Sequence, residues 1–447
     1  MEKLPRISRN LFNIYTLFTR EPFIHHLAQE LEFYSDHNGI LGVILIDLID
    51  NDFSAILLSR DSSKQYKAES LQVSFPNIEE ARIWLEKEYC SDRVSHHEES
   101  KYFDLFKPIV SQEKRHPNFD FLNEHIGFLA AKEVMKEISY HYKDIDGNFI
   151  QQFQSLNGFD ARLWEIYLYC FCREEYFSFK KGSHAPDLII EKMGVEIAIE
   201  AVTINPTENT REALLNISRP FTQAEVEEKL KNEMPIKYAT VLTKKLKKRY
   251  WELSHVAGKS IIIAVADFHA YMSMTWSFSA LLEYLYGYKI SHSKDVNGNV
   301  KIDYTPIEGF VKGTGIKVPA GFFSLPDSEN ISAVLFTAAG TISKFNRMGK
   351  QAGLGSMKNS LIRAGMRHDH DPNAVVPIPF HYVVNEECNE TWAEGVSIFH
   401  NPNALIKIDP KLFPSVAHHF LIDGKILSTF PDFFPYFSMT NNIVTVE

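Results

Sequence analysis

Residues 195–203 read VEIAIEAVT and form the most informative segment of the chain. Side chains alternate across a β-strand, so Glu200 shares a face with Glu196, while Ile197 and Ile199 point to the other face. A carboxylate among apolar neighbours costs free energy unless something compensates it, and a divalent cation is one such compensation. We therefore expect a buried strand that carries a functional acid at Glu200.

The segments around this strand predict an α/β unit over residues 151–290. In chain order, the apolar patterns predict helix 160–175, strands 177–179, 187–190 and 195–203, helices 222–231 and 236–253, strand 260–266 and helix 278–286. The order helix, three strands, helix, strand, helix is typical of a mixed central sheet flanked by helices. The predicted fold class is therefore α/β.

Two further parts flank this unit. Residues 1–150 read as an α+β N-terminal domain, with predicted strands at 40–49, 53–58 and 70–75 and an amphipathic helix at 78–89. Residues 291–447 read as a β-rich C-terminal part, with a hairpin signal at Asp295–Asn299 and a basic, glycine-containing loop at 341–367. The sequence thus predicts domains at 1–150, 151–290 and 291–447.

Composition excludes several classes of protein. The 447 residues carry a net charge of −10, which rules out a wholesale basic coat for nucleic acid, and only four are cysteines, which rules out a disulfide scaffold. The longest apolar run, 261–266, is far shorter than the ~20 residues of a membrane helix. No small-residue cleavage site follows the N-terminal stretch 1–21. We expect a soluble, cytoplasmic protein without a membrane partner.

Three acidic positions fall at defined places in this unit: Glu165 lies on the first helix, Pro186 and Asp187 begin a strand, and Glu200 follows on the next strand. Together with the order of elements, they resemble the PD-(D/E)xK nuclease superfamily over about residues 155–290. The resemblance implies a restriction-endonuclease-like core that hydrolyses phosphodiester bonds with Mg²⁺ (or Mn²⁺). It further implies that Asp187 and Glu200 hold the metal and that Glu165 assists from the helix.

The chain departs from this family at one position. The family's lysine should fall at 202, where this sequence has Val202. Some members supply that lysine from the following helix, and here Leu242 and Leu246 set the apolar face of that helix, with Lys245 beside it. We therefore expect Lys245 to take over the role of the missing lysine, with Arg249 as the second candidate.

The resemblance and the basic segment together predict a nucleic-acid partner, DNA rather than RNA. A flexible basic loop with exposed backbone N–H groups suits phosphate contacts. The residues expected to contact the backbone are Arg249, Lys344, Arg347, Lys350, Lys358, Arg363 and Arg367. Restriction of foreign nucleic acid, that is, defence against viruses, is the role that family habit suggests, and a homodimer is one option for the assembly.

Other interpretations stay open. The chain is also similar, over most of its length, to a bacterial protein family of unknown function that shares blocks such as HNP at 400–402. Val202 favours a rival in which the chain is a non-catalytic nucleic-acid-binding or sensor protein on a decayed nuclease fold. A histidine-based metal hydrolase would require His368, His370, His400 or His418 to converge. Asp267 and His269 either face the nuclease cleft or form a strand-end pair.

Overall fold

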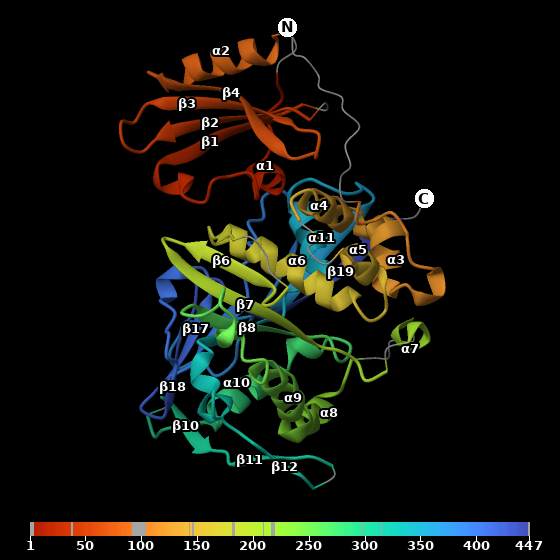
Figure 1. Ribbon diagram of the computed structural model, residues 1–447, viewed down its shortest axis with the longest axis vertical. Helices are drawn as coiled ribbons and strands as arrows, with labels where there is room; N and C mark the ends of the chain where they lie inside the picture. The colour runs from red at the N-terminus through yellow and green to blue at the C-terminus, as the bar shows by residue number, and fades with distance from the viewer. Residues whose placement is uncertain are drawn as a thin grey trace.

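The computed structural model describes residues 4–36, 39–91, 104–142, 144, 147–180, 184–208, 210–215, 220–297, 299–313 and 315–445. Within these residues the chain forms an N-terminal sheet, a large eight-stranded sheet covered by helices on both faces, and a smaller sheet near the C-terminus (Figure 1). The predicted mixed α/β class with a β-rich C-terminal part is confirmed at this level.

The N-terminal unit is a four-stranded antiparallel meander with a helix on each face. Its elements are α1 (Arg9–Thr16), β1 (Ala28–Ser35), β2 (Leu41–Asp47), β3 (Phe53–Arg60), β4 (Tyr66–Phe75) and α2 (Ile78–Tyr89). Leu85 of α2 packs against Ile44, while Phe12 of α1 packs against Val43 on the opposite face. Both faces are covered, which explains why β2 is a continuous apolar run. Helix α2 begins and ends at the residues predicted from the sequence, 78 and 89.

The eight-stranded sheet has the order β18-β17-β16-β13-β8-β7-β6-β5. Its strands are β5 (Ser178–Phe179), β6 (Leu188–Lys192), β7 (Val195–Ile204), β8 (Ser260–Asp267), β13 (Ala333–Thr337), β16 (Val396–His400), β17 (Ala417–Ile422) and β18 (Lys425–Thr429). β6 pairs antiparallel with β7, whereas β7, β8 and β13 run parallel to one another. Strands from residues 291–447 complete this sheet, so the boundary predicted at 290 runs inside one sheet.

Helices cover both faces of this sheet (Figure 1). One face carries α6 (Phe159–Glu174), whose Trp164 indole N–H donates to the Ala264 carbonyl of β8 at 3.0 Å. Beside α6 lie α3 (Pro117–Glu124), α4 (Leu129–Ser139), α5 (Phe149–Gln154) and α11 (Ile342–Gln351). The opposite face carries α9 (Met234–Leu246) and α10 (Phe278–Tyr286). The predicted order from helix 160–175 to helix 278–286 is thus observed.

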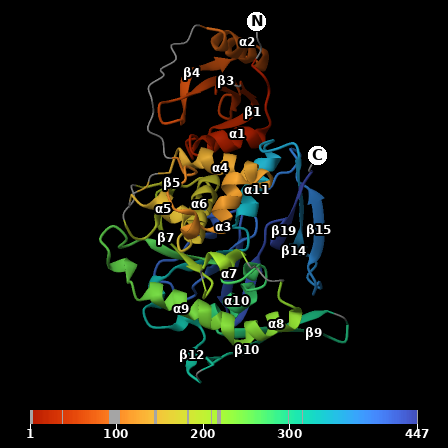
Figure 2. The same ribbon diagram turned by 90° about the vertical axis from the view of Figure 1, so that its right-hand side faces the viewer.

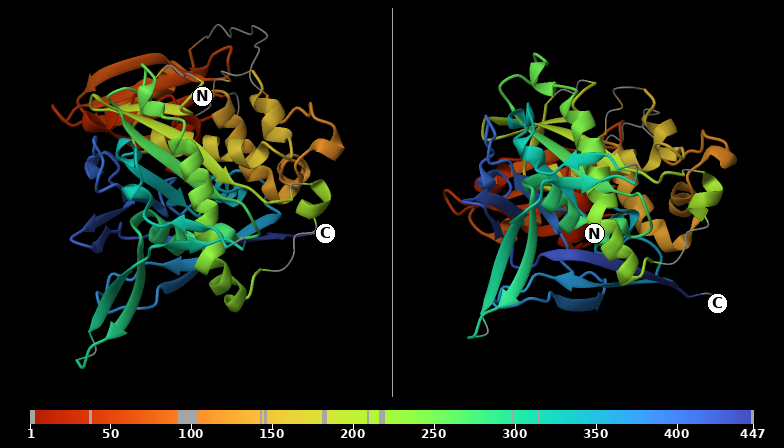
Figure 3. Two further views of the ribbon diagram at one scale, coloured as in Figure 1. Left: turned by 60° about the horizontal axis from the view of Figure 1, so that its bottom comes forward. Right: turned by 90° about the horizontal axis from the view of Figure 1, so that it is seen from below.

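The remaining elements lie at the periphery. A three-stranded sheet of β14 (Asn359–Arg367), β15 (Ile378–Val383) and β19 (Pro435–Val444) stands to one side in Figure 2. The hairpin of β9 (Tyr288–Lys294) and β10 (Val300–Pro306), predicted from its turn, projects from the body in Figure 3. Shorter elements are α7 (Arg211–Leu215), α8 (Gln223–Glu228), β11 (Gly309–Val311) and β12 (Lys317–Pro319). Among the described residues, no helix is long and apolar enough to cross a bilayer.

Candidate active site

Asp187 and Glu200 meet where β6 begins. Leu188 pairs with Ile199 across the antiparallel strands, so the next residues, Asp187 and Glu200, lie opposite each other on the same face. The Ala201 N–H donates to Asp187 Oδ2 at 2.7 Å, which anchors one carboxylate beside the other. The resemblance predicts that these two acids share one metal, and the observed register of β6 against β7 places them opposite each other.

Lys245 reaches this pair from α9. Its Nζ forms an ion pair with Glu200 Oε1, and Glu200 is buried while about a quarter of the Lys245 side chain is exposed. Leu242 of α9 packs in the same apolar cluster as Val202, which brings the helix close to this face of β7. Arg249, the second candidate, lies beyond the helix in a left-handed conformation and pairs with Glu252 and Asp327 instead.

Glu165 approaches from α6, where two donors hold it. Arg162 Nη1 donates to Glu165 Oε2 at 2.7 Å, and the Tyr142 hydroxyl donates to the same oxygen at 3.3 Å. Burial raises the pKa of Glu165, and the charge of Glu200 adds to this rise against the opposing effect of Arg162. Glu165 is therefore electrostatically coupled to the acids of the sheet.

Burial and the neighbouring acids shift the pKa of Asp187. Burial, followed by the charges of Glu200 and Glu165, raises the pKa of Asp187 to about 7, although the Ala201 N–H and Lys245 work against the rise. Near neutral pH the folded protein thus holds a proton on Asp187 for a substantial part of the time. The raised pKa values of Asp187 and Glu165 indicate a site that a cation would stabilise.

The donor set fits a divalent ion held by two carboxylates. Glu200 Oε2 is buried and accepts no hydrogen bond from the described residues, and it belongs to the acid that faces Asp187. Mg²⁺ typically takes one or two protein carboxylates and fills its other positions with water and phosphate oxygens. Within the described ranges, no three or more His, Cys, Asp or Glu side chains are grouped to hold an ion.

The basic segment 341–367 differs from its prediction. It forms α11 and β14 instead of a flexible loop, and Lys344, Arg347 and Arg363 are buried. Glu390 explains this burial: Lys344 Nζ lies 2.6 Å from Oε1, Arg347 Nε 2.8 Å from Oε2 and Arg363 Nη1 3.4 Å from Oε2. The prediction that these three residues contact nucleic acid is wrong, because carboxylates inside the protein neutralise them.

The other predicted contacts of this segment are scattered. Lys350 donates to the Ser356 carbonyl at 3.1 Å, Lys358 is exposed, and Arg367 is half-buried at the end of β14. Exposed positive charge instead gathers beside Lys245, where Lys244, Lys247 and Lys248 face solvent at the end of α9. These three lysines form a smaller exposed basic surface next to the acids.

The four candidate metal-binding histidines do not form one cluster. His400 Nε2 lies 2.9 Å from His418 Nδ1, and His418 Nε2 lies 3.0 Å from the Phe413 carbonyl, inside the large sheet. His368 instead contacts the Tyr436 hydroxyl at 2.9 Å, and His370 contacts the Asp432 carbonyl at 3.1 Å. Each ring has protein partners of its own, so this arrangement does not favour the histidine-based hydrolase.

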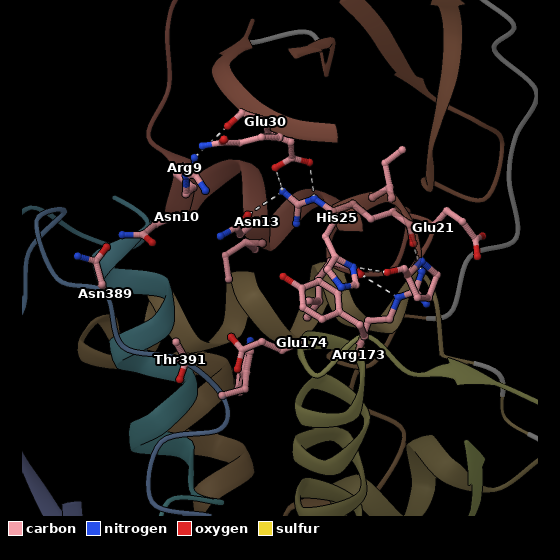
Figure 4. A pocket seen from close by; sticks show the side chains of 18 of the residues that line it. Arg9, Asn10, Asn13, Glu21, His25, Glu30, Arg173, Glu174, Asn389 and Thr391 are labelled. Carbon is pink, nitrogen blue, oxygen red and sulfur yellow. Dashed lines mark hydrogen bonds and ion pairs between the residues drawn. The ribbon is translucent and has the colours of Figure 1, made fainter. Parts of the chain in front are cut away.

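A cavity of about 500 Å³ separates the N-terminal unit from the core (Figure 4). Its charged groups are largely paired with protein atoms: Arg20 Nε donates to Glu30 at 2.6 Å, Arg173 Nε donates to the Leu17 carbonyl at 3.0 Å, and Glu174 accepts from the Ala393 N–H at 2.9 Å. The contact from Arg173 joins α6 to Leu17, the residue that caps the end of α1. We interpret the cavity as a polar joint between the two units.

No protein-family model, curated protein or solved structure matches the chain. The site is therefore interpreted from its own geometry.

The raised pKa of Asp187 predicts that Asp187→Asn stabilises the fold at alkaline pH. The pKa of the unfolded acid is about 4, so the folded protein binds the extra proton between about pH 4 and 7, and its stability falls as pH rises through this window. We expect Asp187→Asn to raise the free energy of unfolding by about 1–2 kcal/mol at pH 8 and hardly at pH 4. Denaturant titrations in EDTA measure this difference.

Glu191→Gln, on the same strand, is the matched control. The Gly194 N–H lowers the pKa of Glu191, so that variant should lose stability at pH 8 rather than gain it. A loss of stability in Asp187→Asn at pH 8 would contradict the crowding of acids described above.

Proposed function

We propose that the protein is a metal-dependent nuclease that hydrolyses phosphodiester bonds of DNA, with restriction of foreign nucleic acid as its bacterial role. The observation that carries the proposal is the meeting of Asp187, Glu200 and Lys245, from two strands and a helix, at one edge of the sheet. The succession α6, β5, β6, β7, α9, β8 is consistent with a restriction-endonuclease-like core, which lends further support.

Each residue has a distinct part in this proposal. Asp187 and Glu200 would hold Mg²⁺ or Mn²⁺, which when bound polarises a phosphate and lowers the pKa of a water. Lys245 places a positive charge beside the acids, where a phosphoryl group gains negative charge during attack. The raised pKa of Glu165 suits a side chain that accepts a proton during the reaction. The exposed lysines at the end of α9 offer contacts to the substrate backbone.

A cleavage assay tests the proposal. The full chain is incubated with double-stranded DNA, single-stranded DNA and RNA in Mg²⁺, in Mn²⁺ or in EDTA. We expect cleavage of DNA with either metal and none in EDTA, and a loss of at least about 100-fold in Glu200→Gln because the carboxylate charge is gone. Product formation on denaturing gels measures the rate.

Glu196→Gln provides the control, because Glu196 lies on the same strand face but pairs with Lys259 at 2.7 Å, away from Asp187. It should retain wild-type activity. If wild type cleaves no substrate with any divalent metal, the nuclease proposal fails, and binding of the same DNA in EDTA would then favour the rival binding module.

A further inference from the structure

A second cavity, also of about 500 Å³, lies at the carboxyl ends of three adjacent parallel strands. The segments that follow β7, β8 and β13 contribute Pro206, His269 and Thr341 to its lining. In open α/β sheets, ligands bind outside the carboxyl ends of parallel strands. Asp267, at the end of β8, pairs with Ile204, four residues and about 13 Å along β7 from Glu200. The cavity is therefore separate from the acids of the proposed nuclease site.

His269 presents a buried nitrogen without a partner to this cavity. Its Nδ1 lies 2.7 Å from Asp267 Oδ1, and only 4% of its side chain is exposed. Its Nε2 forms no hydrogen bond with the described residues, although the ring lines the cavity. The carboxylate of Asp267 accepts from Nδ1–H and so orients the ring, which leaves Nε2 of the neutral ring as an acceptor for a P–OH or sugar hydroxyl group. The Asp267–His269 pair therefore orients a ring that lines the cavity, in addition to forming a contact at the end of β8.

His116 supplies a second such nitrogen from a distant part of the chain. Its Nδ1 accepts a hydrogen bond from the Asn118 N–H at 3.1 Å at the start of α3, so the proton of the neutral ring lies on Nε2. That Nε2 is buried, has no partner among the described residues and belongs to a ring that lines the same cavity. Phe159 stacks on the ring with centroids 4.6 Å apart and fixes its plane.

The first turn of α11 opens into the cavity as well. Thr341 is its N-cap but its side chain makes no capping hydrogen bond, and the first turn holds no acid. The N–H groups of Ile342 and Ser343 have no partner within the helix, and the helix dipole favours negative charge here. The helix start and the Nε2–H of His116 therefore favour an anionic ligand, and Nε2 of His269 adds an acceptor for its hydroxyl groups, although Asp160 and Glu208 also line the cavity.

The rest of the lining is apolar and aromatic. Phe221, Phe268, Met272 and Met274 border the cavity, and Tyr271 lines it with about half of its surface exposed. Such walls suit the flat face of a base. The volume lies within the range of about 300–1,000 Å³ typical of small-molecule sites.

We infer that this cavity binds a nucleoside 5′-phosphate, with the phosphate at His116, His269 and the start of α11 and the base against the aromatic wall. Asp160 and Glu208, which also line the cavity, would accept hydrogen bonds from the sugar hydroxyls. The same group occurs as a free mononucleotide and at the 5′ end of a cleaved strand. Binding needs neither a metal nor cleavage, so the inference stands apart from the proposed nuclease activity.

Calorimetric titration of the full chain in EDTA tests this inference. The probes are AMP, adenosine, inorganic phosphate and a 5′-phosphorylated trinucleotide. We expect AMP to bind at least about tenfold more tightly than adenosine and than phosphate, because it alone fills both halves of the cavity. A trinucleotide that binds more tightly than AMP identifies the ligand as a strand end, and the reverse order identifies a free nucleotide. No binding of either at about 1 mM overturns the inference.

Two variants test the phosphate side and the base side of the cavity independently. Ser343→Asp places a negative charge at the phosphate position, and it should lower AMP affinity at least about tenfold while thermal stability holds or rises, since an acid suits a helix start. Ser343→Asn is its neutral control and should bind like wild type. Tyr271→Ala, at a partly exposed position, should weaken AMP and adenosine but leave phosphate unchanged. Wild-type AMP affinity in Ser343→Asp, or equal affinity for adenosine and AMP, contradicts the assignment.

Discussion

Replacing Lys245 with alanine should lower metal-dependent DNA cleavage by about 100- to 1,000-fold, the loss expected when one transition-state contact of about 3 kcal/mol is removed. Lys245 forms the ion pair with Glu200. Val202 stands where the PD-(D/E)xK nucleases, which the chain resembles, have a lysine, and valine cannot supply that charge. Initial cleavage rates at saturating DNA, compared with wild type, measure the effect. The prediction rests on the proposed nuclease activity.

Lys237→Ala is the matched control, because Lys237 lies on α9 about two turns before Lys245 and pairs with Glu233 instead of an acid of the sheet. It should keep the wild-type rate at saturating DNA. Lys245→Arg should retain part of the activity, and Val202→Lys in the alanine background should restore some of it, since residue 202 shares a strand face with Glu200. A Lys245→Ala protein that cleaves like wild type would show that the lysine has not moved to the helix.

The acids of the sheet could be predicted because short-range rules govern them. Alternation along β7 fixes the face of Glu200, and the tight connection from β6 leaves one register that places Asp187 opposite. Lys245 followed from the helical period set by Leu242 and Leu246, which are buried as expected. The choice of Asp187 and Lys245 also depended on the family resemblance, because nothing local links Lys245 to a strand 45 residues earlier.

The segment 341–367 was misread because its partners lie elsewhere in the sequence. Its glycines and six basic residues are typical of an exposed loop, while the neutralising Glu390 follows more than forty residues after Lys344. A usable signal was present: Phe345, Met348 and Ala352 recur at helical spacing and are buried against α4 and α6. The helical spacing of the apolar residues therefore indicates the structure of this segment better than its basic residues do.

Only part of the cavity at the carboxyl ends of β7, β8 and β13 could be predicted from the sequence. Asp267 and His269 are neighbours in sequence and were recognised as a pair, but His116 joins them from about 150 residues away, and nothing in its local sequence distinguishes it. The helix start at Thr341 lay within the misread segment. A site assembled by the parallel crossovers of a sheet requires the topology before its members can be grouped.

Glu390→Gln should destabilise the protein by about 3–5 kcal/mol at pH 7, because it leaves buried cations without their shared anion. Lys344 and Arg347 are almost fully buried, and both hydrogen bond to Glu390 from one face of α11. Glutamine has nearly the same shape as glutamate. The lost stability therefore measures the removal of the charge and not the creation of a cavity. Equilibrium unfolding in urea, followed by fluorescence and circular dichroism, measures it.

The pH dependence of this loss separates an ionic effect from a packing effect. Burial alone would raise the pKa of Glu390, but Arg347, Lys344 and Arg363 hold it well below its usual range. The stability from an acid with a lowered pKa is present above the unfolded value of about 4.3 and is lost as pH falls below it. The difference between wild type and Glu390→Gln should therefore shrink steadily below pH 4. Glu387→Gln, at a neighbouring exposed acid, should change stability by less than about 0.5 kcal/mol at either pH. A loss in Glu390→Gln that stays constant down to acidic pH would mean that packing, and not charge, holds α11 against the core.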